Sequence, residues 1–236
     1  MERSHRQVTL RLPIRQLLVS LCLLTIAGAA AAHDVAQSDR AFVAGVNGPA
    51  FMPFLYLGAK HMVTGYDHIL FLIGVVFFLY RLKDVVLYVS MFTIGHSLTL
   101  MGGVLLHVGA NAHIIDAIIG LSVAYKGFEN LGGFEKLGLA INTRLAVLVF
   151  GLFHGVGLAT KLMDLAVSRN GLLVNLIGFN LGVELGQVIV LAVVVTLLNL
   201  WRHLPSFDAT ARYANIALIL AGFMLAGNQI AGYLAS

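Results

Sequence analysis

The sequence predicts an all-α membrane protein in which about six helices cross the bilayer after an N-terminal signal peptide. Hydrophobic residues make up 59% of the 236 residues and charged residues only 11%, a composition that soluble domains do not have. The apolar segments are long and continuous, which favours helices over the alternating strands of an outer-membrane barrel. The chain is therefore expected to lie in a lipid bilayer.

The first 32 residues have the parts of a secretory signal peptide. Four arginines precede an apolar stretch that ends in small residues, and cleavage is expected after residues 30–32. The mature chain would then carry eleven basic and ten acidic residues, a net charge of +1 that gives no basis for binding nucleic acid. An uncleaved signal anchor is the alternative. Cys22, the only cysteine, lies in this segment, so the mature chain would have no thiolate ligand.

The mature chain is expected to have a short exported tail over residues 33–50 and one membrane domain over residues 51–236. Residues 51–57 are apolar but too short to span the bilayer, and they are expected at its interface. Six spans follow, at residues 64–80, 85–107, 112–131, 143–164, 172–200 and 212–234.

Lysines and arginines in the loops predict the orientation. The loops after the first, third and fifth spans are the richer ones, with Arg81, Lys83, Lys136, Arg144, Arg202 and Arg212. Because such loops stay in the cytoplasm, the sequence predicts a bacterial inner-membrane protein with both mature termini outside.

The strongest sequence signal is an eight-residue stretch at the start of the first span. His61, Asp67 and His68 stand there, next to an apolar run. A charged group at the centre of a membrane helix costs about 2.5–3.5 kcal/mol on insertion scales. Polar residues in this position therefore indicate that the protein binds something polar.

Three further spans repeat the pattern. His96 lies near the middle of the second span, with Thr93 and Ser97 beside it, and His154 lies near the middle of the fourth. In the fifth span, Glu184 belongs to a polar stripe that also contains Asn180 and Gln187. Gly178, Gly182 and Gly186 recur on roughly the opposite face, where another helix can approach closely.

Other polar residues have simpler expected roles. Glu129 and Asn130 in the third span are candidates for supporting the site, and more strongly for hydrogen bonds between helices. Asp116 is expected to be a solvated helix end.

Imidazole and carboxylate groups without sulfur suit divalent ions such as nickel, cobalt, zinc, copper, iron or manganese. We expect a transient metal site, because a closed structural zinc site would show cysteine pairs at short spacing. The expected metal ligands are His61, Asp67, His68, His96, His154 and Glu184.

The same residues resemble the HupE/UreJ family of bacterial membrane proteins. The similarity covers about residues 51–234 in collinear order, and it is carried by His61 to His68, Phe92 to Thr99, Leu121 to Asn130, Phe150 to Gly155 and Phe179 to Gln187. The resemblance implies a role in supplying nickel, or next cobalt, to metalloenzymes such as hydrogenase or urease. It also implies metalloenzyme maturation proteins as partners.

The leading hypothesis is a permease for a divalent transition metal, with no permanently bound cofactor and no enzymatic activity. No nucleotide-binding motif is present. Three alternatives stay open. The first is a membrane accessory protein that delivers metal without transporting it, the second is a cytochrome with His96 and His154 as haem ligands, and the third is an intramembrane hydrolase using Ser97.

Overall fold

The computed structural model describes residues 42–164 and 169–236, and all regular secondary structure in this part of the chain is helical. The prediction of an all-α fold is therefore confirmed. The predicted signal peptide, residues 1–32, and residues 33–41 of the predicted tail lie outside the described residues.

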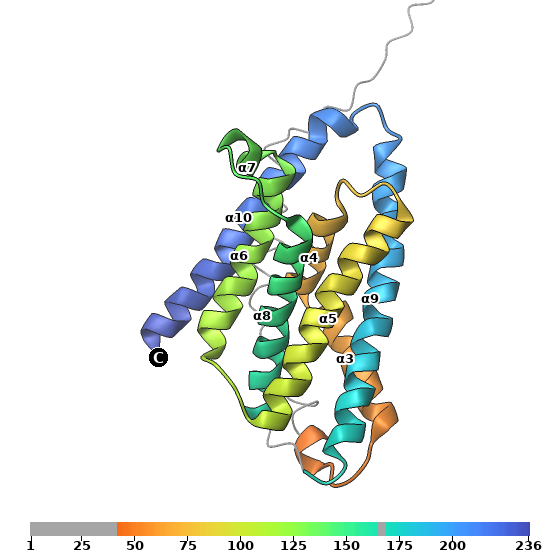
Figure 1. Ribbon diagram of the computed structural model, residues 1–236, viewed down its shortest axis with the longest axis vertical. Coiled ribbons are helices and arrows are strands. Elements are labelled where there is room, and N and C mark those ends of the chain that lie inside the picture. Colours follow the sequence, from red (N-terminus) through yellow and green to blue (C-terminus); the bar gives the residue numbers. More distant parts are fainter. Residues whose placement is uncertain (1–41, 165–168) are drawn as a thin grey trace, which may run out of the picture.

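The helices form an elongated bundle (Figure 1). In chain order they are α3 (Phe51–Thr64), α4 (Tyr66–Val76), α5 (Leu82–Leu106), α6 (Ala112–Asn130), α7 (Gly133–Lys136), α8 (Thr143–Asp164), α9 (Leu172–Arg202) and α10 (Phe207–Ala235). In the orientation of Figure 1, α3 and α6 begin at the lower end, and α5, α8 and α10 end there.

Four helices in the described part of the chain are long and apolar enough to cross a membrane. They are α5, α8 over residues 143–163, α9 and α10. These helices match four of the six predicted spans. A fifth prediction, residues 112–131, coincides with the 19-residue helix α6, which carries Asp116, Lys126 and Glu129 and is less apolar.

The first predicted span has a different construction from the one expected. The helix does not begin near residue 64, because α3 already starts at Phe51 and includes the segment that was expected at the membrane interface. Gly65 then adopts an extended conformation, with φ −75° and ψ 99°, and separates α3 from α4. The first predicted span is therefore built as two helices, α3 and α4, with the interruption inside the bundle (Figure 1).

Glycines bring α3 and α9 together along their length, as the sequence predicted for one stripe of α9. A Cβ atom added at Gly182 would overlap the Leu55 carbonyl group, and one added at Gly186 would lie 2.8 Å from the Ala59 oxygen. Two other close pairs, α5 with α8 and α6 with α10, use glycines in the same way. Small residues are the usual means of tight helix packing in membranes.

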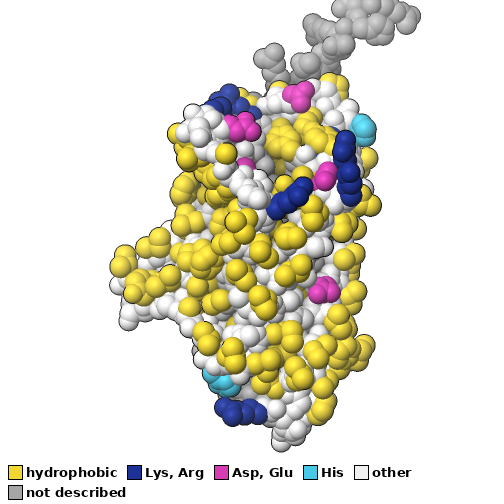
Figure 2. All heavy atoms as spheres, in the orientation of Figure 1, with side chains coloured by type: hydrophobic (Ala, Val, Ile, Leu, Met, Phe, Trp, Pro, Cys, Tyr) yellow, Lys and Arg dark blue, Asp and Glu magenta, His cyan; other side chains and the backbone are white. Residues whose placement is uncertain are grey.

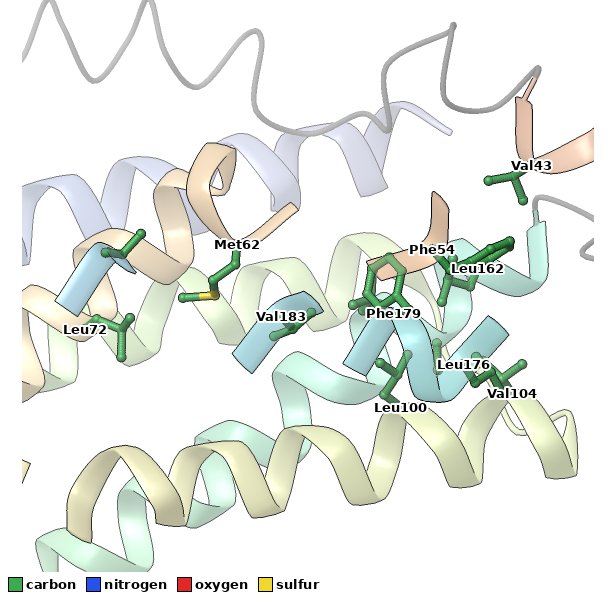
Figure 3. Close-up of a cluster of buried hydrophobic side chains, with 13 residues drawn as sticks. Val43, Phe54, Met62, Leu72, Leu100, Val104, Leu162, Leu176, Phe179 and Val183 are labelled. Carbon is green, nitrogen blue, oxygen red and sulfur yellow. The ribbon is translucent and has the colours of Figure 1, made fainter. Parts of the chain in front are cut away.

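The apolar core has two clusters. The first joins residues of α3, α4, α5, α8 and α9, among them Phe54, Leu72, Leu100 and Phe179 (Figure 3). The second is built around Phe71 on α4 and Phe92 on α5, and it also contains residues of α8, α9 and α10.

The far end of α4 is held by α9. The Arg202 guanidinium donates hydrogen bonds to the carbonyl oxygens of Val76 and Phe77, at 2.8 and 2.6 Å. It also lies 4.5 Å from the centre of the Tyr80 ring. These bonds satisfy carbonyl groups that a helix end leaves unpaired.

The surface is largely hydrophobic, and most of the Lys and Arg side chains visible on the face in Figure 2 lie toward its upper end. This end carries the loops that the sequence predicts to be cytoplasmic. An apolar surface of this kind indicates a membrane protein.

We expect Gly182→Ala to lower the free energy of unfolding by about 1–3 kcal/mol, because the new methyl group must separate α3 from α9. The matched control is Gly227→Ala in α10, where an added Cβ meets nothing within 4 Å. The control should be neutral or slightly stabilising, since alanine is the better helix former. Unfolding in detergent micelles measures both, and equal effects would contradict the close packing.

Candidate functional site

Four histidines from four helices meet in the interior of the bundle. His61 comes from the last turn of α3, His68 from the first turn of α4, His96 from α5 and His154 from α8. The centre of the His68 ring lies 5.1 Å from that of His61, 6.0 Å from that of His96 and 4.9 Å from that of His154. His68 is thus the middle of the cluster, which we call the histidine cluster.

The break at Gly65 places the first two histidines. It puts His61 and His68 on opposite sides of the interruption, with Asp67 in the first turn of α4, where the helix dipole favours a negative charge. A Cβ atom at Gly65 would lie 3.1 Å from the His68 Nδ1 atom and 3.2 Å from the Asp67 Oδ1 atom. Only glycine leaves this pair undisturbed.

The close contact of α5 with α8 places the other two histidines. Gly155, next to His154, lies against the carbonyl group of His96. The Thr99 hydroxyl group fixes the pairing, since it donates a hydrogen bond to the Leu152 oxygen on α8 at 2.7 Å. The glycine beside the histidine therefore lets α5 and α8 approach closely.

Hydrogen bonds fix the orientation of two of the rings. The Nδ1–H group of His154 donates to the Phe150 carbonyl oxygen at 2.7 Å, and that of His68 donates to the Asp67 carboxylate at 3.0 Å. Because both partners can only accept, the Nε2 atom of each neutral ring carries the free lone pair. A carboxylate bonded to the far nitrogen of an imidazole is the usual support of a metal-binding histidine.

The Nε2 atoms of all four histidines are buried and have no hydrogen-bond partner. A buried polar atom left without a partner costs about 1–3 kcal/mol. Four such nitrogens gathered in one place are suited to bind a cation.

The cluster is not closed around an ion in this conformation. Among the described residues, no group of three or more His, Cys, Asp or Glu side chains has the geometry to hold a metal. Imidazole nitrogens bind such ions at about 2.0–2.1 Å, so binding requires the rings to move inward.

Apolar rings form the walls of the cluster. Phe92 lies 5.0 Å from the His154 ring and 6.0 Å from the His96 ring, and Phe71 lies 5.3 Å from the His154 ring, between ring centres. Both phenylalanines are fully buried. They keep water away from the imidazoles, a role that the sequence alone did not assign to them.

The predicted supporting residues have mixed positions. The Thr93 hydroxyl group donates to the Gln187 Oε1 atom at 3.2 Å and so links α5 to α9. Asn180 is buried, and its Oδ1 atom has no partner. Ser97 is half-buried on α5, next to His96.

Glu184, one of the six expected metal ligands, does not point into the bundle with its stripe. Its side chain is exposed and lines an open groove of about 730 Å³ between α5 and α9. The other lining residues are mostly apolar. The structure therefore brings together His61, Asp67, His68, His96 and His154, and it leaves Glu184 at the lipid-facing surface.

Glu129 and Asn130 take part in a separate polar network toward the upper end of α6. Glu129 forms an ion pair with Lys126 and accepts a hydrogen bond from Thr143, while Asn130 donates to the Gly74 oxygen at 2.9 Å and to Asn215. These bonds join α6 to α4, α8 and α10. They fit the helix-to-helix role that was the stronger expectation.

Asp116 does not lie at a solvated helix end, as had been expected. It is 8% exposed and forms an ion pair with Lys161 of α8, with nitrogen-to-oxygen distances of 3.0 and 2.9 Å.

Comparison with known proteins identifies the family. The chain matches the model of the HupE / UreJ protein family over residues 37–236, and so it belongs to this family. Membership suggests a role linked to nickel or cobalt transport, or an accessory function. No curated protein and no solved structure matches the chain.

We expect Gly65→Ala to weaken the binding of Co²⁺ by about tenfold, because the methyl group displaces the Asp67 and His68 side chains that orient the cluster. The visible absorption of bound Co²⁺ measures the affinity. Gly102→Ala in α5, where an added Cβ meets nothing within 4 Å, is the control. Unchanged affinity in the Gly65 variant would show that the cluster does not depend on this break.

Proposed function

We propose that this member of the HupE / UreJ family is an inner-membrane permease that imports a divalent transition metal, nickel first and cobalt next, for metalloenzyme maturation. The observation that carries the proposal is the set of four buried, unpartnered Nε2 atoms from α3, α4, α5 and α8. A soluble chelator could gather histidines on its surface. Here the histidines lie in the interior of an apolar bundle, where burying polar groups is unfavourable and indicates a functional role.

The chemistry of the donors supports a transition metal. Neutral imidazole nitrogens bind nickel and cobalt well, whereas calcium and magnesium prefer oxygen. Asp67 contributes one negative charge beside His68, which partly offsets the charge of the ion. His68 and His154 offer their lone pairs without any change of tautomer, since their Nδ1 atoms already donate elsewhere.

The broken helix supports transport over permanent storage. Transporters commonly place their substrate site where a membrane helix is interrupted, near the middle of the bilayer. An open set of ligands holds an ion weakly enough to release it, which conduction requires. The interruption at Gly65 lies directly beside His68, so opening and closing of the cluster and movement of α4 are coupled.

The arrangement argues against the haem alternative. A haem between His96 and His154 would need a flat space several rings wide. The buried side chains of Phe92 and His68 occupy the surroundings of both rings, at 4.9–6.0 Å between ring centres. A metal ion needs far less space than a haem.

Metal uptake tests the proposal. Cells that lack their own nickel permease would express the wild type, His68→Ala, His154→Ala and Glu184→Gln, and their nickel, cobalt, zinc, copper and manganese would be measured. We expect nickel accumulation to fall by at least about tenfold in both histidine variants, as loss of a metal ligand implies. Glu184→Gln should accumulate nickel almost as the wild type does, because its side chain lies outside the cluster.

The outcomes separate the two roles suggested by the family. No accumulation of any metal by wild-type protein that is present in the membrane would replace the permease by a non-transporting accessory protein. Accumulation that is lost only in Glu184→Gln would move the site from the histidine cluster to the groove between α5 and α9.

A further inference from the structure

One ion pair next to the histidine cluster has no part in the proposed binding of metal. Lys161 and Asp116 lie toward the lower end of the bundle, on α8 and α6, and the carboxylate is almost completely buried. Charged groups inside a membrane bundle are rare, and a helix-to-helix contact can be made without them. This pair therefore needs an explanation of its own.

Geometry connects the pair to the cluster. His154, Gly157 and Lys161 follow one another on a single face of α8, and Lys161 stands two turns, or about 10 Å, from His154 along the axis. Gly157 leaves room for the carboxylate: a Cβ atom there would lie 3.7 Å from the Asp116 Oδ1 atom. The ammonium group is near enough for its charge to act on His61, Asp67 and His154.

We propose that Lys161 is a tethered cation that lowers the affinity of the histidine cluster for metal, and that Asp116 holds it away from Asp67. The inference rests on the proposed function, since it concerns the same cluster. A divalent ion that enters the histidine cluster is repelled by the Lys161 ammonium group, which is paired with the Asp116 carboxylate. Repulsion by Lys161 shortens the time that the ion stays, which favours its release.

The proposal predicts effects of opposite sign for the two partners. Removal of the positive charge in Lys161→Gln should tighten metal binding at least about tenfold, as expected for a unit charge some 10 Å from a divalent ion even when water screens much of the interaction. Asp116→Asn should weaken binding by a similar factor, because Lys161 loses its partner and competes for the Asp67 carboxylate. The double variant carries neither charge, and its affinity should lie between those of the two single variants.

A purely structural ion pair behaves differently. Loss of either partner would then leave a buried, unpaired charge, and both single variants would weaken binding and stability together. Glu129→Gln is the matched control: it breaks the other lysine–carboxylate pair of α6, which lies toward the upper end of the bundle. It should lower stability without changing the affinity for metal.

Calorimetric titration of the purified, detergent-solubilised proteins with Ni²⁺ and Co²⁺ is the experiment, and thermal unfolding of each sample reports the folded fraction. Lys161→Met replaces Lys161→Gln if the latter does not fold. Tighter binding in the lysine variant and weaker binding in Asp116→Asn supports the proposal. If the wild type binds metal but the two variants shift the affinity in the same direction or not at all, the proposed role of Lys161 is wrong and the proposed function stands. If the wild type binds neither metal, the proposed function is overturned as well.

Discussion

The structure depends on one constraint, which is that a polar atom inside an apolar bundle must have a partner. Most of the polar side chains here obey it within the chain. Arg202 finds carbonyl oxygens at the end of α4, Asn130 bonds to the Gly74 oxygen, and Lys126 pairs with Glu129. The Nε2 atoms of the histidine cluster do not. Four of the eight buried side-chain atoms without a hydrogen-bond partner among the described residues lie in this one cluster, and this concentration distinguishes a binding site from helix-to-helix contacts.

Glycine is the means by which the bundle assembles this place. Each histidine-bearing helix has a neighbour at very short range, and the contact residues are glycines such as Gly155 on α8 and Gly58 on α3. Because the helix backbones approach closely, imidazole side chains from different helices can lie near one another. Tight packing between helices and convergence of the rings are thus two results of the same residues.

Much of this could be predicted from the sequence. Continuous apolar segments predicted the helical fold, and the spacing of Gly178, Gly182 and Gly186 predicted the packing face of α9. Five of the six expected metal ligands lie in or beside the histidine cluster, since mid-span titratable groups rarely occur without a shared purpose. The family resemblance was confirmed over residues 37–236.

The rest required three-dimensional information. Periodicity along α9 placed Glu184 on the face of Asn180 and Gln187, but at 100° per residue the three span about 60° around the helix, and Glu184, at one edge of this stripe, lines the open groove. The ion pair of Asp116 and Lys161 joins residues 45 positions apart, so no local pattern could pair them. The helix break at Gly65 was not recognised because a single glycine is tolerated within many helices.

The contacts of Arg202 have a mechanical consequence. They anchor the end of α4 at Val76 and Phe77, whereas the other end is separated from α3 by the break at Gly65. A rotation of α4 about its anchored end would therefore move His68, near the other end, the furthest. A helix of eleven residues is about 16 Å long, so a rotation of about 5° displaces that end by about 1.4 Å. A displacement on this scale is comparable with the adjustment between separate rings and a shared ligand.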